Sequence, residues 1–260
     1  MENKFYLFAG PCVIEGEEKI LKQVEDMTKI LSPFKDKIYW VFKASFDKAN
    51  RTSFSSFRGV GIERGIEIFK EIKKKFNVPI ITDVHETTQV ERISEVVDFI
   101  QIPAFLCRQT DLLYEAGKTK KPVNIKKGQF MAPEDMYYAV EKVKKGGSEE
   151  VFLTERGTTF GYHNLVVDMR SFLIMKKFGK VIYDGTHSLQ KPSGEGGFSG
   201  GMREFLEPLC RAAVAVGIDG LFLEAHPEPE FALSDSKTQL PLEKLKNLLE
   251  VLLKIREVIK

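Results

Sequence analysis

The sequence predicts an α/β fold, and three observations support this prediction. Short apolar runs recur along the chain without the alternation of half-exposed strands, which is typical of parallel strands buried on both faces. Segments with helical spacing of apolar residues lie between these runs. No linker or low-complexity stretch interrupts residues 1–260, so we expect a single domain.

Eight apolar runs are the candidate strands. They are residues 5–9, 38–42, 79–82, 99–102, 122–125, 151–154, 181–183 and 220–223. The helical patterns cover residues 20–31, 62–76, 90–97, 136–143, 165–178, 205–216 and 242–259. Strict alternation implies right-handed crossovers, and eight strand–helix units predict a closed (β/α)8 TIM barrel. An open dinucleotide-binding sheet is the alternative, but no glycine-rich turn follows the first run.

The composition narrows the class of protein. A net charge of +2 and a pI near 8.2 argue against a dedicated nucleic-acid binder. No apolar stretch approaches the length of a membrane span, and the N-terminus lacks a signal-peptide pattern. The three cysteines are widely spaced and odd in number, which indicates a reducing compartment. We expect a cytoplasmic protein that binds neither nucleic acid nor membrane.

Polar or reactive side chains follow every predicted strand. In a TIM barrel, catalytic residues project from the C-terminal ends of the strands, where long βα loops surround them. The residues in this position are Cys12, Lys43, Ser45, Asp83, His85, Gln101, Lys126, Arg156, Asp184, His187, Glu224 and His226. Their convergence predicts an enzyme active site at this end of the barrel.

The segment KASFDKANRTSFSSFRG, residues 43–59, is the richest of these strand ends. It carries two lysines, two arginines, an asparagine and five hydroxyl side chains, with Asp47 as its one acid. Phosphate and carboxylate groups require such directed N–H and O–H donors beside positive charge. A solvated basic loop is the alternative that the segment alone leaves open.

A metal site is predicted at the point where the barrel closes. Cys12, His187 and Glu224 follow the first, seventh and eighth strands, and Asp235 lies in the long loop after the eighth. A thiolate, an imidazole and two carboxylates suit a divalent transition metal, with iron, zinc, manganese and cobalt left open. A small buried hydrophobic role is the alternative for Cys12.

Lys126 has an alternative role as well. A lysine at the end of a barrel strand can form a Schiff base in a class I aldolase. Lys43, Lys48 and Arg156 crowd the same mouth, and such a cluster favours binding of a multiply charged anion. His163, in GYHNLVVD, is expected to open the sixth helix as a capping or surface residue.

These motifs resemble the metal-dependent class of 3-deoxy-D-manno-octulosonate 8-phosphate synthases. The matching stretches include AGPCVIE, FKASFDKANRTS, TDVHE, VNIKKGQF, LTERGTTFGY, YDGTHSLQ and EAHPEPEFALSD, and they cover essentially the whole chain. The resemblance implies a transferase that condenses phosphoenolpyruvate, D-arabinose 5-phosphate and water. Its products would be 3-deoxy-D-manno-octulosonate 8-phosphate, a lipopolysaccharide inner-core sugar, and inorganic phosphate. It also implies a homotetramer.

The resemblance further implies roles for individual residues. The metal ligands would be Cys12, His187, Glu224 and Asp235, and phosphoenolpyruvate would be held by Ser45, Lys48, Gln101, Lys126 and Arg156. Lys43, Asn50, Asp83 and His85 would face the pentose phosphate, and Arg51 and Thr52 would reach a neighbouring subunit's site. Catalytic roles are expected for Lys126, Asp83, His85 and Asp184. Residues 188–201 and 225–240 are expected to order over bound substrates as lids.

Two other functions remain open from the sequence. The first is the sister 3-deoxy-7-phosphoheptulonate synthase, which uses erythrose 4-phosphate. The Ala-Asn pair in KANRTS favours the octulosonate enzyme, because the sister family tends to have a proline in that segment. The second is a phospho-sugar sensor without turnover. A complete cationic pocket together with a four-ligand metal set argues against this function.

Overall fold

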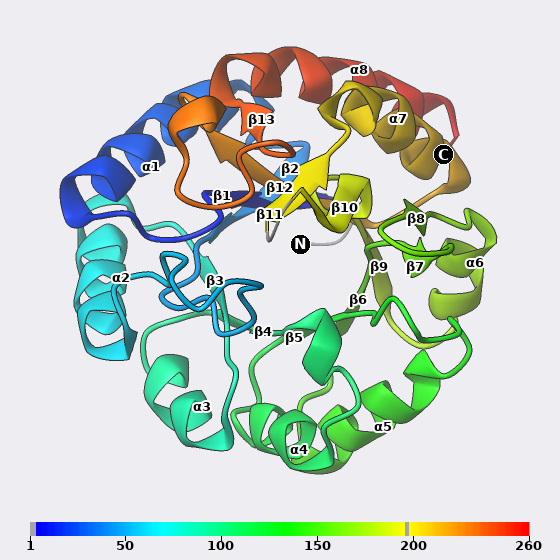
Figure 1. Cartoon of the computed structure of the whole chain (residues 1–260), viewed down its shortest axis with the longest axis horizontal. Coiled ribbons are helices and arrows are strands. Elements are labelled where there is room, and N and C mark those ends of the chain that lie inside the picture. Colours follow the sequence, from blue (N-terminus) through cyan, green and yellow to red (C-terminus); the bar gives the residue numbers. More distant parts are fainter. Residues whose placement is uncertain (1–3, 196–197, 260) are drawn as a thin grey trace.

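The computed structural model describes residues 4–195 and 198–259, which contain a closed parallel barrel. Its strands are β1 (Phe5–Gly10), β2 (Ile38–Lys43), β3 (Ile80–Asp83), β4 (Phe99–Ile102), β5 (Val123–Lys126), β6 (Val151–Glu155), β9 (Lys180–Asp184) and β12 (Gly220–His226). Each pairs with the next in this order, and β12 pairs with β1 to close the ring. Figure 1 looks into the barrel, with the helices around it. The predicted TIM barrel is confirmed.

Helices cover the outside of the barrel. They are α1 (Glu17–Leu31), α2 (Ile62–Phe76), α3 (Thr87–Ser94), α4 (Thr110–Lys118), α5 (Met136–Gly146), α6 (Arg170–Met175), α7 (Leu206–Val216) and α8 (Leu245–Val258). Helix α4 had no predicted counterpart, because its nine residues contain only a short apolar stripe. Among the described residues, no helix has the length and apolar character needed to cross a membrane.

The predicted helix over residues 165–178 is wrong in its first half. Leu165–Val166 forms β8, which pairs antiparallel with β7 (Thr158–Thr159), and the helix itself is limited to α6. His163 lies in the turn of this hairpin with a φ of 55°, so it does not open a helix. The apolar residues at 165–167 belong to a hairpin that packs on the barrel. Their spacing matched that of a helix, and for this reason the sequence pattern predicted one.

The interior of the barrel is filled with aromatic side chains. Tyr6 and Phe8 of β1 contact Phe152 of β6 with ring centroids 4.9 and 5.4 Å apart. Strands β1 and β6 are not neighbours in the sheet, so these edge-to-face contacts cross the interior. The barrel is therefore a packed core, and only the polar ends of its strands are left to form a site.

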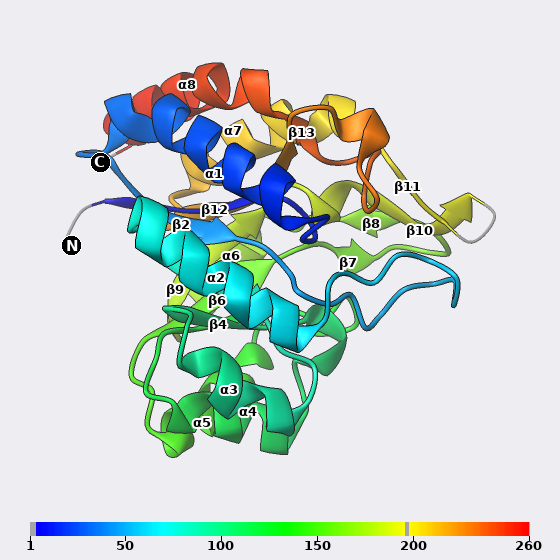
Figure 2. The ribbon, with the colours of Figure 1, turned by 90° about the vertical axis from the view of Figure 1, so that its left-hand side faces the viewer.

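The βα connections extend from one end of the barrel. Figure 2 shows the β2–α2 connection and the hairpin of β10 (Gln190–Glu195) and β11 (Phe198–Gly201) on the side opposite the N-terminal end of the described chain. The expected lid over residues 188–201 thus contains a hairpin, and residues 196–197 lie outside the described residues. The connection after β12 ends in β13 (Leu240–Pro241), which pairs with the end of β12.

A buried ion pair joins the residue that follows β5 to the last residue of β6. Lys127 and Glu155 are both 0% exposed, and the Lys127 Nζ lies 3.5 Å from the Glu155 Oε1. Lys127 also donates to the Thr158 Oγ1 at 3.0 Å and to the Met131 carbonyl at 3.3 Å. The pair therefore ties the segments that follow the two strands to each other.

We predict that Lys127→Met lowers the free energy of unfolding by about 3–5 kcal/mol, because it leaves the Glu155 carboxylate buried without its cation. The double variant K127M/E155Q should recover part of this loss. A glutamine at 155 still accepts from the Gly157 N–H, which now donates to the Glu155 Oε1 at 2.7 Å. Urea unfolding of the three proteins measures both effects. A double variant no more stable than K127M would contradict the prediction.

Candidate active site

The C-terminal ends of the strands surround a cavity of about 440 Å³. Among its lining residues, the predicted substrate-binding ones are Lys48, Asn50, Arg51, Thr52, Gln101, Lys126 and Arg156. Asp83, His187 and Asp235, for which catalytic or metal-binding roles were expected, line it too. Donors from β2, β4, β5 and β6 thus converge on one space that is suited to a multiply anionic ligand.

Other predicted residues lie beneath the cavity and are not part of its lining. Lys43 is 0% exposed, and its Nζ donates to the Glu224 Oε1 at 2.7 Å and to the Cys12 carbonyl at 2.8 Å. Lys43 is absent from the lining of the cavity, and its expected role toward the pentose phosphate stays a prediction. Burial opposes charge on Glu224, but the surrounding cations, Lys43 first, lower the pKa of this carboxyl overall.

Ser45, Asp83 and His85 form a second buried group. The Ser45 hydroxyl donates to the Asp83 Oδ1, and the His85 Nε2 lies 3.2 Å from the Asp83 Oδ2. Burial favours the neutral acid, but Lys48 and His85 outweigh it and hold the pKa of Asp83 well below its usual range. Asp83 therefore remains a carboxylate that orients both neighbours.

Lys126 is held by three groups from β9, β12 and the turn after β9. Its Nζ lies 2.7 Å from the Asp184 Oδ2, 3.3 Å from the His187 Nδ1 and 3.5 Å from the ring centroid of Phe222. Burial lowers the pKa of Lys126, while the Asp184 charge acts in the opposite direction. The ammonium is thus fixed over an aromatic face with its charge balanced by a carboxylate.

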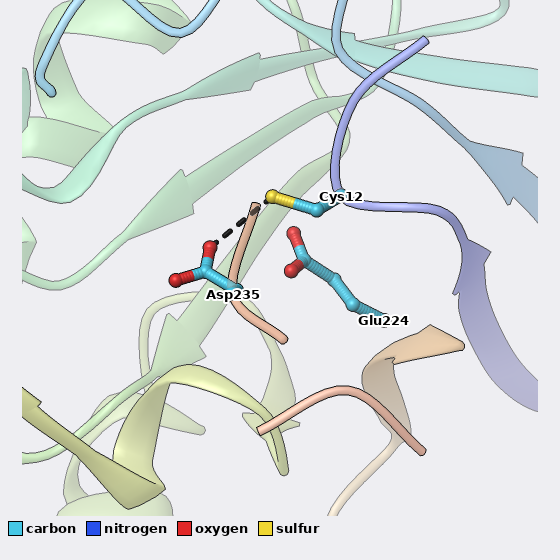
Figure 3. A group of neighbouring side chains, drawn as sticks. All are labelled: Cys12, Glu224 and Asp235. Atoms are coloured by element: carbon cyan, nitrogen blue, oxygen red, sulfur yellow. Dashed lines mark hydrogen bonds between the residues drawn. The ribbon is translucent and has the colours of Figure 1, made fainter. Parts of the chain in front are cut away.

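The predicted metal ligands come together at the closure of the barrel. Cys12, Glu224 and Asp235 have candidate ligand atoms within 4.8 Å of one another. Figure 3 shows these three side chains pointing toward one another. The His187 Nε2 is 3.4 Å from the Glu224 Oε1 and 3.7 Å from the Asp235 Oδ2. Burial, followed by the negative charge of Glu224, raises the pKa of the Cys12 thiol well above its ordinary value.

This donor set fits a divalent transition metal. The Glu224 Oε2 is buried and has no hydrogen-bond partner among the described residues. The Cys12 Sγ lies 3.1 Å from the Asp235 Oδ2, so soft and hard ligands face one another. A cation between them would satisfy the orphaned oxygen and favour the thiolate.

Arg51 lies within its own chain's site. Its guanidinium donates to the Ser234 Oγ at 2.6 Å and to the Phe57 carbonyl at 2.9 Å. Ser234 also accepts from the Cys12 thiol at 2.8 Å. The role of Arg51 and Thr52 at a neighbouring subunit's site stays a prediction.

Sequence reasoning missed several polar residues at the cavity, among them Gln129, Gln190 and Ser234. Ser234 precedes the predicted ligand Asp235, and Gln190 follows His187 by three residues, so proximity to a ligand was the available signal. Neither carries a charge or a motif that would have separated it from other loop residues.

The fold and site define a TIM-barrel protein with a cationic mouth beside a mixed thiol–carboxylate–imidazole cluster. The whole chain, residues 1–260, matches the model of the DAHP synthetase I family. The chain therefore belongs to that family.

Curated relatives of the chain cover nearly all of its length. It is 53% identical over 259 residues to a 2-dehydro-3-deoxyphosphooctonate aldolase of Koribacter versatilis, covering 98% of this chain and 92% of the relative. Proteins of the same name from Francisella tularensis subsp. holarctica and Legionella pneumophila are 51% identical, with 98% and 100% of this chain and 93% and 94% of the relatives covered.

The paired carboxylate of Asp184 predicts acid sensitivity. Burial raises its pKa, but His187 and Lys126 lower it more, so the folded-state pKa lies below the unfolded value of about 4. The stability contributed by the charged form is present above that value and is lost as pH falls through the folded pKa. We expect chelator-treated wild type to exceed D184N in stability at pH 7, with the gap narrowing below about pH 4.

Urea unfolding of the two proteins between pH 7 and pH 3 measures this gap. Asp168 provides a matched control, because D168N removes an exposed carboxylate that pairs with Arg170. Its gap to wild type should be small throughout. A gap for D184N that is independent of pH would contradict the assignment of Asp184.

Proposed function

We propose that the chain condenses phosphoenolpyruvate with D-arabinose 5-phosphate and water to give 3-deoxy-D-manno-octulosonate 8-phosphate and inorganic phosphate. The observation that carries the proposal is similarity over the full length to enzymes named 2-dehydro-3-deoxyphosphooctonate aldolase. The cationic cavity at the strand ends supports it, because both substrates are phosphorylated anions.

In this reaction, C3 of phosphoenolpyruvate bonds to the aldehyde carbon of the pentose, and water supplies an oxygen to C2. The C2–O bond to phosphate breaks, and the phosphate leaves. Arg156 and Lys126 balance the charge of phosphoenolpyruvate, and the Arg156 Nη1, which has no partner among the described residues, is available to it. Preorganised charges of this kind stabilise the transition state without reorganisation.

Lys126 also supplies a proton. Its pKa is lowered by burial, so the ammonium is a better acid than an exposed lysine, and Asp184 holds it in place at 2.7 Å. We assign it to the aldehyde oxygen, which gains negative charge as the C–C bond forms. Of the two protons that the water loses, one restores the Lys126 ammonium and the other leaves with the phosphate. Asp83 lines the cavity and fixes the Ser45 hydroxyl and the His85 imidazole beneath it.

Cys12, His187, Glu224 and Asp235 would hold a divalent transition metal in this proposal. When bound, the metal supplies Lewis-acid polarisation of a substrate oxygen or of water. The orphaned Glu224 Oε2 and the facing thiol and carboxylates support this part of the proposal.

The heptulonate synthase is the alternative function within this family. The names of the relatives favour the octulosonate enzyme, and the Ala49–Asn50 pair of KANRTS points the same way. A non-catalytic sensor would need no buried Lys126–Asp184 pair poised at the cavity floor. The proposal further includes a cytoplasmic homotetramer, which size-exclusion chromatography with light scattering tests.

We predict phosphate release from phosphoenolpyruvate with arabinose 5-phosphate and at least about tenfold less with erythrose 4-phosphate at equal concentrations. The donors that hold the aldose phosphate are fixed on the chain, so a shorter sugar misplaces its aldehyde. A colourimetric phosphate assay measures both rates. Equal or reversed rates would favour the heptulonate alternative, and no release with either aldose would favour the sensor.

We predict that Cys12→Ala and chelator each reduce phosphate release at least about 100-fold, because loss of one ligand or of the ion removes the Lewis acid. Cys210→Ala is the matched control, since Cys210 is buried in α7 away from the cavity. C210A should retain phosphate release within about threefold of wild type if only the Cys12 thiol is needed for activity. Full activity of C12A or of the chelated protein would refute the metal part of the proposal.

A further inference from the structure

Gln190 lies between two groups of the candidate active site. Its Oε1 accepts from the Arg156 Nη2 at 2.8 Å, and its Nε2 donates to the Asp235 Oδ1 at 2.7 Å. A guanidinium only donates and a carboxylate only accepts, so the two partners determine the orientation of the amide. One side chain therefore links a predicted phosphoenolpyruvate ligand to a predicted metal ligand.

The link leaves Arg156 able to bind an anion. Arg156 is 6% exposed and lines the cavity, and its Nη1 has no hydrogen-bond partner among the described residues. An anion can thus accept from the Nη1 while the Nη2 remains on Gln190. Such an anion fixes the guanidinium plane, because both nitrogens belong to one rigid group.

The link also leaves Asp235 able to bind a cation. Gln190 donates to the Asp235 Oδ1, whereas the Asp235 Oδ2 faces the Cys12 Sγ at 3.1 Å and the His187 Nε2 at 3.7 Å. Asp235 has a φ of 49°, a left-handed conformation that few side chains other than Asn and Asp adopt readily. Its carbonyl accepts from the Thr238 and Gln239 N–H groups, so the side chain is anchored on a tight turn.

We propose that Gln190 is a positioning residue that couples anion binding at Arg156 to the conformation of the Asp235 turn. An anion on the Arg156 Nη1 holds the guanidinium, the guanidinium holds the Gln190 amide, and the amide holds the Asp235 carboxylate with its Oδ2 toward Cys12. Gln190 begins the β10–β11 hairpin, and Asp235 lies in the connection after β12. The same bridge therefore joins the two segments that flank the cavity. This inference rests on the proposed function, which supplies phosphoenolpyruvate as the anion.

Hydrogen exchange of the full-length protein as purified tests the coupling. The reporters are the backbone amides of Thr238 and Gln239, whose bonds to the Asp235 carbonyl close the turn at 3.0 and 3.1 Å. In wild type we expect saturating phosphoenolpyruvate to slow their exchange about tenfold. In Gln190→Met, which keeps the length of the side chain and removes both bonds, the slowing should fall below about twofold at saturation.

Gln129→Met provides the control. Gln129 lines the same cavity, and its Oε1 has no hydrogen-bond partner among the described residues, so it makes no comparable bridge through this oxygen. It should keep the exchange response of wild type once phosphoenolpyruvate is saturating. A calorimetric titration of each protein with phosphoenolpyruvate sets the saturating concentration. It also distinguishes weaker phosphoenolpyruvate binding from a loss of coupling between Arg156 and the Asp235 turn.

Two outcomes would overturn the inference. Equal slowing in Q190M and wild type would show that the turn responds without the bridge. Loss of the response in Q129M as well as in Q190M would show that it depends on the cavity wall in general. Failure of wild type to bind phosphoenolpyruvate would instead overturn the proposed function, and the inference with it.

Discussion

The site depends on the pairing of charges that the barrel removes from water. Lys43 pairs with Glu224 and Lys126 with Asp184, and all four side chains are buried or nearly so. A buried charge without a partner is costly, so each pair must form if the strand ends are to carry ions at all. The first pair joins β2 to β12 and the second joins β5 to β9, with one strand between them in each case. The Lys43–Glu224 pair spans the point where β12 meets β1, so it requires a closed barrel and couples closure to the assembly of the site.

Arg156 lines the cavity without a close carboxylate partner of this kind, and its Nη1 has no hydrogen-bond partner among the described residues. Burial lowers the pKa of this guanidinium, so its charge is under-compensated in the described residues. An anionic substrate supplies the missing charge and hydrogen-bond acceptor in a site that is already ordered. The structural pairs keep the other cations fixed, and the unpaired nitrogen of Arg156 is left for binding. Whether the charge of a cation is balanced therefore depends on its burial and its partners, and not on the number of basic residues at the site.

The sequence predicted the barrel and the positions of the strand ends well, because buried parallel strands leave apolar runs that are easy to read. It failed where the signal was short or ambiguous. Helix α4 has few apolar positions, and the β7–β8 hairpin carries apolar residues that imitated the start of a helix. The pattern also could not say which charge each cation meets. Lys43, for example, pairs with Glu224, and this partner is set by the stagger of the strands around the closed ring.

Residues 43–59 show how fold and specificity share one segment. Its first residues, Lys43 and Ser45, are fully buried and bonded to carboxylates from other strands, so they are fixed by the barrel itself. Asn50 and Thr52 are exposed and line the cavity, where no strand constrains them. An enzyme that changed its aldose would have to preserve the buried half and could alter the exposed half at little cost in stability. Substrate choice is therefore expected to lie in Asn50 and its neighbours, while the chemistry common to the family lies with the buried ion pairs.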